Sequence, residues 1–408
     1  MNAVGQVPAA AEPPAPAAAG HPRPNVIKRV LQGDLASVRV VLVLGAIWLV
    51  FQSQNDRFLS ATNLTNLMLQ ITGVGLISIG VVYVLLLGEI DLSVGAVSGL
   101  AAAVMAVMNV KHGWNPYLAI GAGVLTGLVI GVVQGALATA FGIPSFVVTL
   151  AGLLAWQGAL LYVLGDTGTV NLNDPTITGL ANTFYSDSVG WVIAVAVVAG
   201  YAALALWGYR HRVAAQLTDQ RLAPIVVRIA VVAVAVFATV AILNSDRGVP
   251  LALLILIAFL TVMEFIAVRT TFGRKVYAVG GNIEAARRAG INTSAVRIAV
   301  FGIAGTMSAV GGIFLASRLL AVNQSSGGSD LLLLAIAGPV IAGTSLFGGR
   351  GSVWSALLGA LVIGSISNGM DLLALESSVK YMVTGAVLLV AVIIDAIARR
   401  QRQATGRV

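Results

Sequence analysis

The chain has 408 residues, of which 58% are apolar and only 10% are charged, and its formal net charge is +8. Soluble globular proteins carry about 25% charged residues, so this composition excludes a chain that lies mostly in water. The absence of cysteine excludes disulfide bonds, thiol catalysis and cysteine-ligated metals. The excess of Lys and Arg is typical of the cytoplasmic loops of membrane proteins and does not indicate nucleic-acid binding. The three histidines lie far apart, so no metal site is predicted: His21, His112 and His211.

Residues 1–35 are rich in Ala and Pro and are predicted to form a disordered cytoplasmic tail. Residues 36–398 are predicted to form one transmembrane domain, and residues 399–408 a basic cytoplasmic tail. Many apolar segments of this domain approach the ~20 residues that cross a hydrocarbon core. We therefore predict an all-α, polytopic bundle of about 12 membrane segments, at residues 38–53, 63–87, 94–110, 117–140, 146–164, 190–208, 229–243, 250–268, 297–316, 332–347, 353–370 and 380–397.

The distribution of positive charge predicts the orientation of the bundle. Most of the 24 Lys and Arg residues fall in connections that share a side with the N-terminus when the segments are counted through. Cytoplasmic loops carry this excess, so both termini are predicted to be cytoplasmic. The stretch that ends at Gly88 and the segment 332–347 are short or interrupted by glycine, which is also compatible with broken or re-entrant helices.

The polar loop at 269–296 is the most informative connection, and the charge pattern places it in the cytoplasm. Asn282 is a favourable N-cap, and Glu284 lies in the first turn, where the helix dipole favours an anion. Gly290 suits the position just past a helix end. We therefore predict a short, rigid helix between Asn282 and Gly290. From the residues alone, this helix is equally compatible with a solvated connector between two spans.

Polar residues within or between the apolar segments are candidates for lining or gating a pathway. Glu89 and Asp91 lie between two long apolar segments, and carboxylates at membrane depth tend to face a cavity or a partner. The alternative interpretation places them at a cytoplasmic turn, with Asp91 and Ser93 as helix caps. The other candidates are amides and one aromatic residue, for which hydrogen bonding between helices is the alternative: Gln70, Gln134, Trp156, Gln157 and Asn368.

Several strings resemble the permease subunits of ribose- and xylose-type sugar ABC importers, and the xylose-type permease most of all. Glu284-Ala-Ala-x-x-x-Gly290 resembles the loop by which ABC-importer permeases dock on their ATPase. Further similar strings are Gly88-Glu-Ile-Asp-Leu-Ser-Val-Gly95, Ile143-Pro-Ser-Phe-Val-Val-Thr-Leu-Ala-Gly152 and Ile341-Ala-Gly-Thr-Ser-Leu-Phe-Gly-Gly-Arg-Gly-Ser-Val353. The resemblance implies an ATPase-coupling role for Gly281, Asn282, Glu284, Ala285, Ala286, Arg287, Arg288 and Gly290.

The resemblance also implies the architecture and the partners. It implies a ten-helix core with an extra central helical pair, which residues 190–243 fit. It further implies a second permease copy, a cytoplasmic ATPase that holds ATP and Mg²⁺, and an extracytoplasmic sugar-binding protein. No cofactor is expected in the chain itself, which lacks the G-x-x-x-x-G-K-[ST] phosphate loop. One departure concerns residues 332–334, which are leucines where many relatives carry acids, so that the nearest acid is Asp330.

Two other functions are compatible with a polytopic chain. An ion-coupled secondary sugar transporter would need charged coupling residues within its spans and would have no use for a loop that docks on an ATPase. An intramembrane enzyme, such as a lipid-linked sugar transferase, would need clustered acids or metal ligands at an interface. We therefore expect an ATP-driven importer of a monosaccharide such as xylose.

Overall fold

The computed structural model describes residues 35–215 and 222–404. The predicted N-terminal tail, apart from residue 35, and residues 405–408 lie outside the described residues. Every predicted apolar segment overlaps a helix, although the segment 332–347 is helical only as far as Ile341. The helices are α2 (Leu35–Gln54), α3 (Ala61–Leu86), α4 (Val94–Val110), α5 (Pro116–Ala140), α6 (Ser145–Leu164), α8 (Asp187–Ala214), α9 (Ala223–Asn244), α10 (Leu251–Arg269), α13 (Thr293–Leu319), α14 (Ser329–Ile341), α15 (Trp354–Leu372) and α16 (Ser377–Ala404).

Eight of these helices are long and apolar enough to cross a membrane: α3, α5, α6, α8, α9, α10, α13 and α15. Shorter apolar helices are α4, α14 and residues 40–54 of α2. The helix α16 continues to Ala404, so the first residues of the predicted basic tail are helical. The fold is therefore a polytopic helical bundle, as predicted.

Some elements were not predicted from the sequence. Three short helices connect the longer ones: α7 (Pro175–Asn182), α11 (Thr271–Gly281) and α12 (Ile283–Arg288), of which only α12 was expected. Two short antiparallel ladders also form, between β1 (Thr169–Asn171) and β4 (Ala321–Asn323), and between β2 (Phe184–Tyr185) and β3 (Val249–Pro250). They tie together connections that are far apart in the sequence.

The helices α3 and α13 form the centre of the bundle, and α13 packs against α3, α4 and α5. In the most apolar 18-residue stretch of α3, 89% of the residues are buried inside the chain. In the corresponding stretch of α9, only 6% are buried. Glycine permits a close contact between Gly127 on α5 and Gly305 on α13. A methyl group on either glycine would lie within 2.3 Å of the other's carbonyl oxygen. Small residues on α5 therefore allow its backbone to pack closely on α13.

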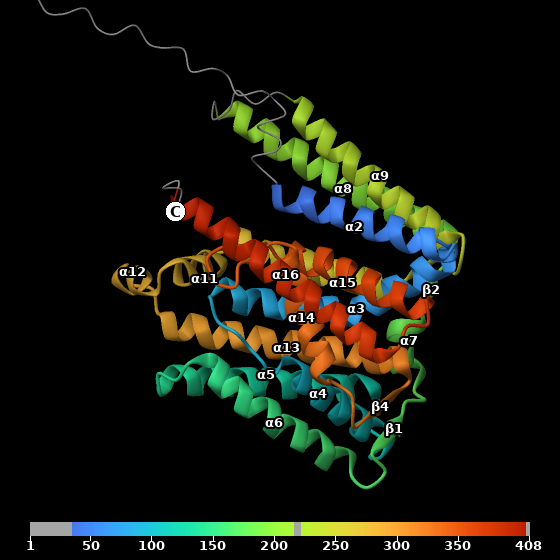
Figure 1. Ribbon diagram of the computed structural model, residues 1–408, viewed down its shortest axis with the longest axis vertical. Helices are drawn as coiled ribbons and strands as arrows, with labels where there is room; N and C mark the ends of the chain where they lie inside the picture. Colours follow the sequence, from blue (N-terminus) through green and yellow to red (C-terminus); the bar gives the residue numbers. More distant parts are fainter. Residues whose placement is uncertain (1–34, 216–221, 405–408) are drawn as a thin grey trace, which may run out of the picture.

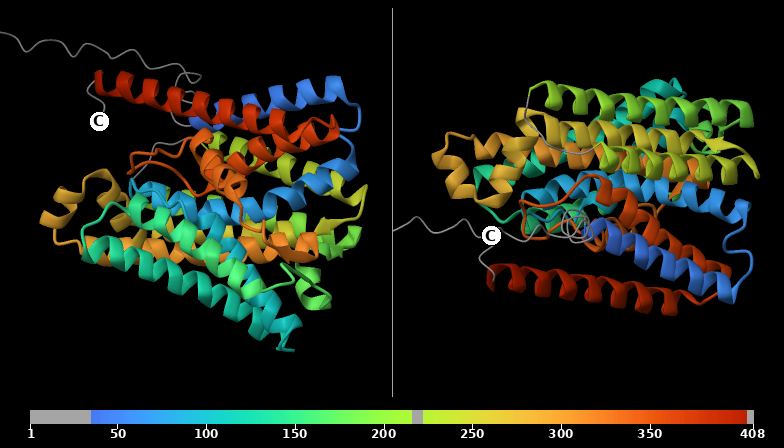
Figure 2. Two further views of the ribbon diagram at one scale, coloured as in Figure 1. Left: turned by 60° about the horizontal axis from the view of Figure 1, so that its bottom comes forward. Right: turned by 90° about the horizontal axis from the view of Figure 1, so that it is seen from above.

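The two ends of the bundle differ in their connections (Figure 1). The helices α11 and α12 project from one end of the bundle. At the same end lie the start of α2, the end of α16, the end of α8 and the start of α9. The β-ladders and α7 lie at the opposite end. Figure 2 shows the same separation from two further directions. The two termini of the described chain thus share one side of the bundle with α12.

Candidate functional site

The helix α14 is too short to cross a membrane by itself. Its 13 residues rise about 20 Å at 1.5 Å per residue, whereas a hydrocarbon core is about 30 Å thick. Its N-terminus follows a loop in which Gly327 lies against the backbone of Gly95 and Gly99 on α4. Its C-terminus gives way to a loop at Gly343, whose φ is +100°. The segment 332–347 is therefore a broken helix, whereas α3 is continuous to Leu86.

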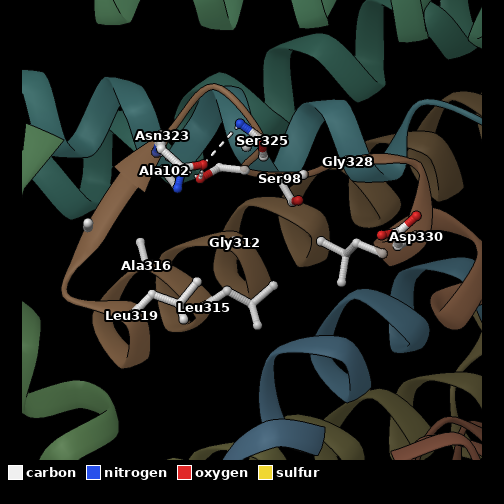
Figure 3. Close-up of a pocket in the computed structure, with 15 residues that line it drawn as sticks. Ser98, Ala102, Gly312, Leu315, Ala316, Leu319, Asn323, Ser325, Gly328 and Asp330 are labelled. Atoms are coloured by element: carbon white, nitrogen blue, oxygen red, sulfur yellow. Dashed lines mark hydrogen bonds between the residues drawn. The ribbon is translucent and has the colours of Figure 1, made fainter. Parts of the chain in front are cut away.

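Two cavities flank the N-terminus of α14. The first, of about 280 Å³, lies between α4, the end of α13 and the loop before α14, and Figure 3 shows polar side chains of that loop at its wall. The second, of about 320 Å³, lies between α3, α13, α14 and α15. Leu315, Asp330 and Leu331 line both cavities. A cavity of this size is at the lower end of the range for small-molecule sites.

Three of the predicted pathway residues, Asp91, Gln134 and Trp156, lie in one buried polar cluster. The Asp91 Oδ1 atom accepts hydrogen bonds from the Ser93 amide (2.8 Å) and the Ser93 hydroxyl (2.7 Å). The same hydroxyl lies 3.0 Å from Gln134 Oε1. The side-chain nitrogens of Gln134 and Trp156 are buried without a hydrogen-bond partner, and both lie beside Gly152 on α6. Asp91 therefore bonds within its own turn, as the capping interpretation expects, and Ser93 connects this turn to α5.

A second group of predicted residues lies at the second cavity. Asn63 and Asn368 exchange two side-chain hydrogen bonds, at 2.7 and 3.1 Å, and so join α3 to α15. The Asn368 amide also lies 3.4 Å from Gln70 Oε1, and Gln70 lines the cavity. Asn368 thus fits the alternative of hydrogen bonding between helices, whereas Gln70 faces open space.

The remaining predicted pathway residues lie apart from both groups. Gln157 donates a hydrogen bond to the Gln324 carbonyl oxygen at 3.1 Å, in the loop before α14. Glu89 forms an ion pair with Arg297 on α13, and its second carboxylate oxygen is buried without a partner. The pair therefore ties the turn between α3 and α4 to the start of α13.

The helix α12 has the caps that the sequence predicts. Asn282 accepts a hydrogen bond from the Ala285 amide at 2.9 Å, and Gly290 has a φ of +80°. Glu284 forms an ion pair with Arg287 at 3.1 Å, and each of the two side chains is about 60% exposed. Within residues 281–290 only Ala286 is buried. The other predicted coupling residues, including Gly281, Ala285 and Arg288, are exposed. The helix therefore presents its surface away from the bundle.

The helix α11 lies between α12 and two parts of the bundle, the end of α3 and the loop before α15. The Tyr277 hydroxyl donates to the Gly351 carbonyl oxygen at 2.8 Å, and the Gly349 amide donates to the Leu86 carbonyl oxygen at 2.8 Å. Gly280 lies directly against these two backbones. Burial, and then the nearby Glu264 carboxylate, raise the pKa of Tyr277 to about 12. The phenol therefore stays a hydrogen-bond donor at physiological pH.

Comparisons with known proteins agree with this geometry. The family described as "Branched-chain amino acid transport system / permease component" matches residues 63–392. The xylose transport system permease protein of Escherichia coli strain K12 is 38% identical over 366 residues, which cover 89% of this chain and 92% of that protein. The chain belongs to this family of permeases.

Two further relatives of the permease have names that refer to other sugars. The ribose import permease protein of Bacillus subtilis is 31% identical over 342 residues, which cover 84% of this chain and 87% of that protein. The fructose import permease protein of Rhizobium meliloti is 26% identical over 369 residues, which cover 90% and 87%. No solved structure matches the permease. The permease is therefore a membrane transport component rather than an enzyme.

Three charged residues of the permease site were not among the residues predicted from the sequence. Glu264 accepts hydrogen bonds from the Val353 amide (2.8 Å) and the Ser352 hydroxyl, and so fixes the start of α15. Arg318 and Asp330 line the second cavity. Arg318 lies at the end of an apolar helix, where charged side chains are common. Glu264 lies within the predicted segment 250–268, and an acid inside an apolar segment is a signal that could have identified it. Among the described residues, no group of His, Cys, Asp or Glu could hold a metal ion.

Proposed function

We propose that this permease forms the membrane pathway of an ATP-driven importer for xylose or a similar aldose. The sugar class rests on the 38% identity to a xylose permease. The observation that carries the ATP-driven mechanism is α12, a capped helix whose exposed surface stands clear of the bundle. Its neighbour α11 contacts the end of α3 and the loop before α15. A stiff helix in this position can transmit a movement of an ATPase to the bundle.

The proposed orientation places α12 in the cytoplasm. Cytoplasmic loops of membrane proteins are rich in Lys and Arg, and the segments nearest to α12 carry Arg269, Arg274, Lys275, Arg287 and Arg288. Both termini then lie in the cytoplasm, because the described ends of α2 and α16 share this side of the bundle. An even number of spans follows, and we propose twelve, with α14 and the loops at its two ends making up one of them.

We propose three protein partners. A cytoplasmic ATPase with two nucleotide sites docks on α12, and it holds ATP and Mg²⁺, since the chain has no phosphate loop. An extracytoplasmic sugar-binding protein docks at the opposite end, beside the two β-ladders. A second copy of the permease completes the pathway in a homodimer.

The proposal is tested by reconstituting the permease with its ATPase and binding protein in liposomes. We expect ATP-dependent accumulation of labelled xylose, and slower accumulation of ribose and fructose. Accumulation driven by an ion gradient without ATP hydrolysis would contradict the proposal and favour a secondary transporter. Accumulation of no monosaccharide would contradict the proposed substrate class.

The role of α12 is tested by Gly290→Pro. Proline requires a φ near −65°, whereas Gly290 has a φ of +80°, so the end of α12 must change its path. We expect loss of sugar uptake and of copurification with the ATPase. Gly113→Pro is the matched control, because Gly113 has a φ of +67° in the connection between α4 and α5, on the side away from α12. Equal ATPase binding by the two variants would show that α12 is not the docking helix.

A further inference from the structure

The second cavity, between α3, α13, α14 and α15, has an arrangement of polar groups that the packing of the bundle does not use. The Gln70 side-chain nitrogen, the Arg318 guanidinium and the Ser367 hydroxyl all belong to residues that line this cavity. Within the described part of the chain, none of these three groups donates a hydrogen bond. All three residues are half-buried, so these donors can bond to water or to a ligand that replaces it. Three such donors around one space suit a polar molecule.

The same cavity also presents acceptors. Asp330 lies in the first turn of α14 and accepts a hydrogen bond from the Tyr381 hydroxyl at 2.5 Å. Asp371, near the end of α15, is paired with Lys380. Two backbone amides at the start of α14, those of Ser329 and Asp330, have no acceptor among the described residues, and the N-cap there is a glycine without a side chain. A ligand with hydroxyl groups can both donate to these carboxylates and accept from these amides.

The charges around the cavity balance. Arg318, Asp330 and Asp371 line the cavity. Lys380 does not line it but is paired with Asp371, so the four charges together cancel. A cavity without net charge does not favour an anion or a cation, and a purely apolar ligand would leave the donors unsatisfied. A neutral polyhydroxylated molecule fits both conditions. The volume of about 320 Å³ is within the range of small-molecule sites.

The position of the cavity relates it to one side of the membrane. Its charged part, Arg318 and Asp371, lies at the ends of α13 and α15 that point away from α12, because α15 begins next to the loop that Tyr277 holds. Its deeper wall includes Val74, which lies thirteen residues into α3 and so about 20 Å along that helix. The cavity therefore extends from the side opposite α12 towards the middle of the bundle.

We propose that this cavity is a weak binding site for a neutral monosaccharide, which the sugar occupies on its way from the binding protein into the pathway. Arg318 and Asp330 are the residues that contact the sugar hydroxyls. This inference rests on the proposed function and adds a site within the permease itself. The site needs only low affinity, because a sugar that binds tightly along a pathway cannot leave it quickly.

Thiol protection provides a test that does not depend on transport. The chain has no cysteine, so Ser367→Cys places a single thiol in the cavity wall. The complex of permease and ATPase is placed in lipid nanodiscs without binding protein, and the rate of alkylation by a small water-soluble reagent is measured. We expect millimolar xylose to slow the modification of Cys at 367 several-fold, whereas polyethylene glycol of equal osmolarity leaves it unchanged. Ser245→Cys, on an exposed connection away from the cavity, should react at the same rate with and without sugar.

Second-site variants identify the contacts. In the Ser367→Cys background, Arg318→Gln and Asp330→Asn should each abolish the protection by xylose at the same concentration. Val74→Cys, in the deeper wall, replaces Ser367→Cys if the latter does not fold. Unchanged alkylation at every sugar concentration, or protection that persists in both contact variants, would overturn the proposal. Uptake by the wild-type complex is measured in parallel: normal uptake with an unprotected thiol contradicts only the sugar site, whereas absent uptake contradicts the proposed function.

Discussion

The contact of Gly280 with two backbones makes a single methyl group a test of how α11 acts on the bundle. In Gly280→Ala the new methyl would lie 1.7 Å from the Leu86 carbonyl oxygen and 2.8 Å from the Gly349 amide nitrogen. Both neighbours are backbone atoms, which cannot rotate away as a side chain can. Because interiors are close-packed, α11 must move about 1 Å from α3. That movement separates α11 from the end of α3 and from the loop at Gly349, and overpacking of this kind costs about 1–3 kcal/mol.

The expected result of Gly280→Ala is loss of coupling with the protein still folded. In liposomes, ATP hydrolysis should continue while sugar uptake falls at least several-fold, so that more ATP is hydrolysed for each sugar. Gly281→Ala is the control for thermal stability, because a methyl there meets no atom within 4 Å. It should melt at or slightly above the wild-type temperature, since alanine favours helix over glycine by about 1 kcal/mol. Wild-type uptake per ATP in Gly280→Ala would refute a role of this contact in coupling.

Three further predictions concern single polar contacts. Arg297→Gln leaves the half-buried Glu89 carboxylate unpaired, which should cost about 3 kcal/mol of stability, and adding Glu89→Gln should restore most of the loss in a thermal-melting assay. Asp91→Asn keeps the oxygen that accepts hydrogen bonds from Ser93 but removes the charge. If the charge gates the pathway, sugar uptake slows while copurification with the ATPase is unchanged. Wild-type uptake would support a capping role alone. Asn282→Ala removes the N-cap of α12, worth about 1 kcal/mol, and should weaken ATPase binding as titrated by affinity measurement, whereas Asn282→Ser should retain it.

The features that could be predicted from the sequence are those that depend on neighbouring residues. Long apolar segments identify membrane helices because the bilayer accepts little else, and each predicted segment overlaps a helix, with the segment 332–347 helical only as far as Ile341. The caps of α12 were predictable because the Asn282 side chain bonds to an amide three residues away. Gly290 was predictable because a helix end of this kind requires a positive φ.

The other features depend on contacts between distant residues. The helix α11 is held by the loop around Gly351, which no local pattern identifies. The break at the start of α14 depends on the close approach of Gly327 to α4, and the apolar residues that follow conceal it. Glu264 meets its partner Val353 across 89 positions of sequence. The role of Gln70 at a cavity, and of Asn368 in joining two helices, likewise became distinguishable only when the helices were placed side by side.

The pair α8 and α9 is attached to the rest of the chain at a single place. The two helices pack on each other along one edge of the bundle (Figure 2). In their most apolar 18-residue stretches, only 11% of the residues of α8 and 6% of those of α9 are buried. At the base, the Asn244 amide donates to the Asp187 carbonyl oxygen at 3.2 Å, and β2 pairs with β3 just outside. The chain therefore leaves and rejoins the bundle at nearly the same point. A hairpin of this kind is a self-contained insertion: its gain or loss during evolution needs one event, leaves the packing of α3 and α13 intact, and exchanges mainly lipid-facing surface.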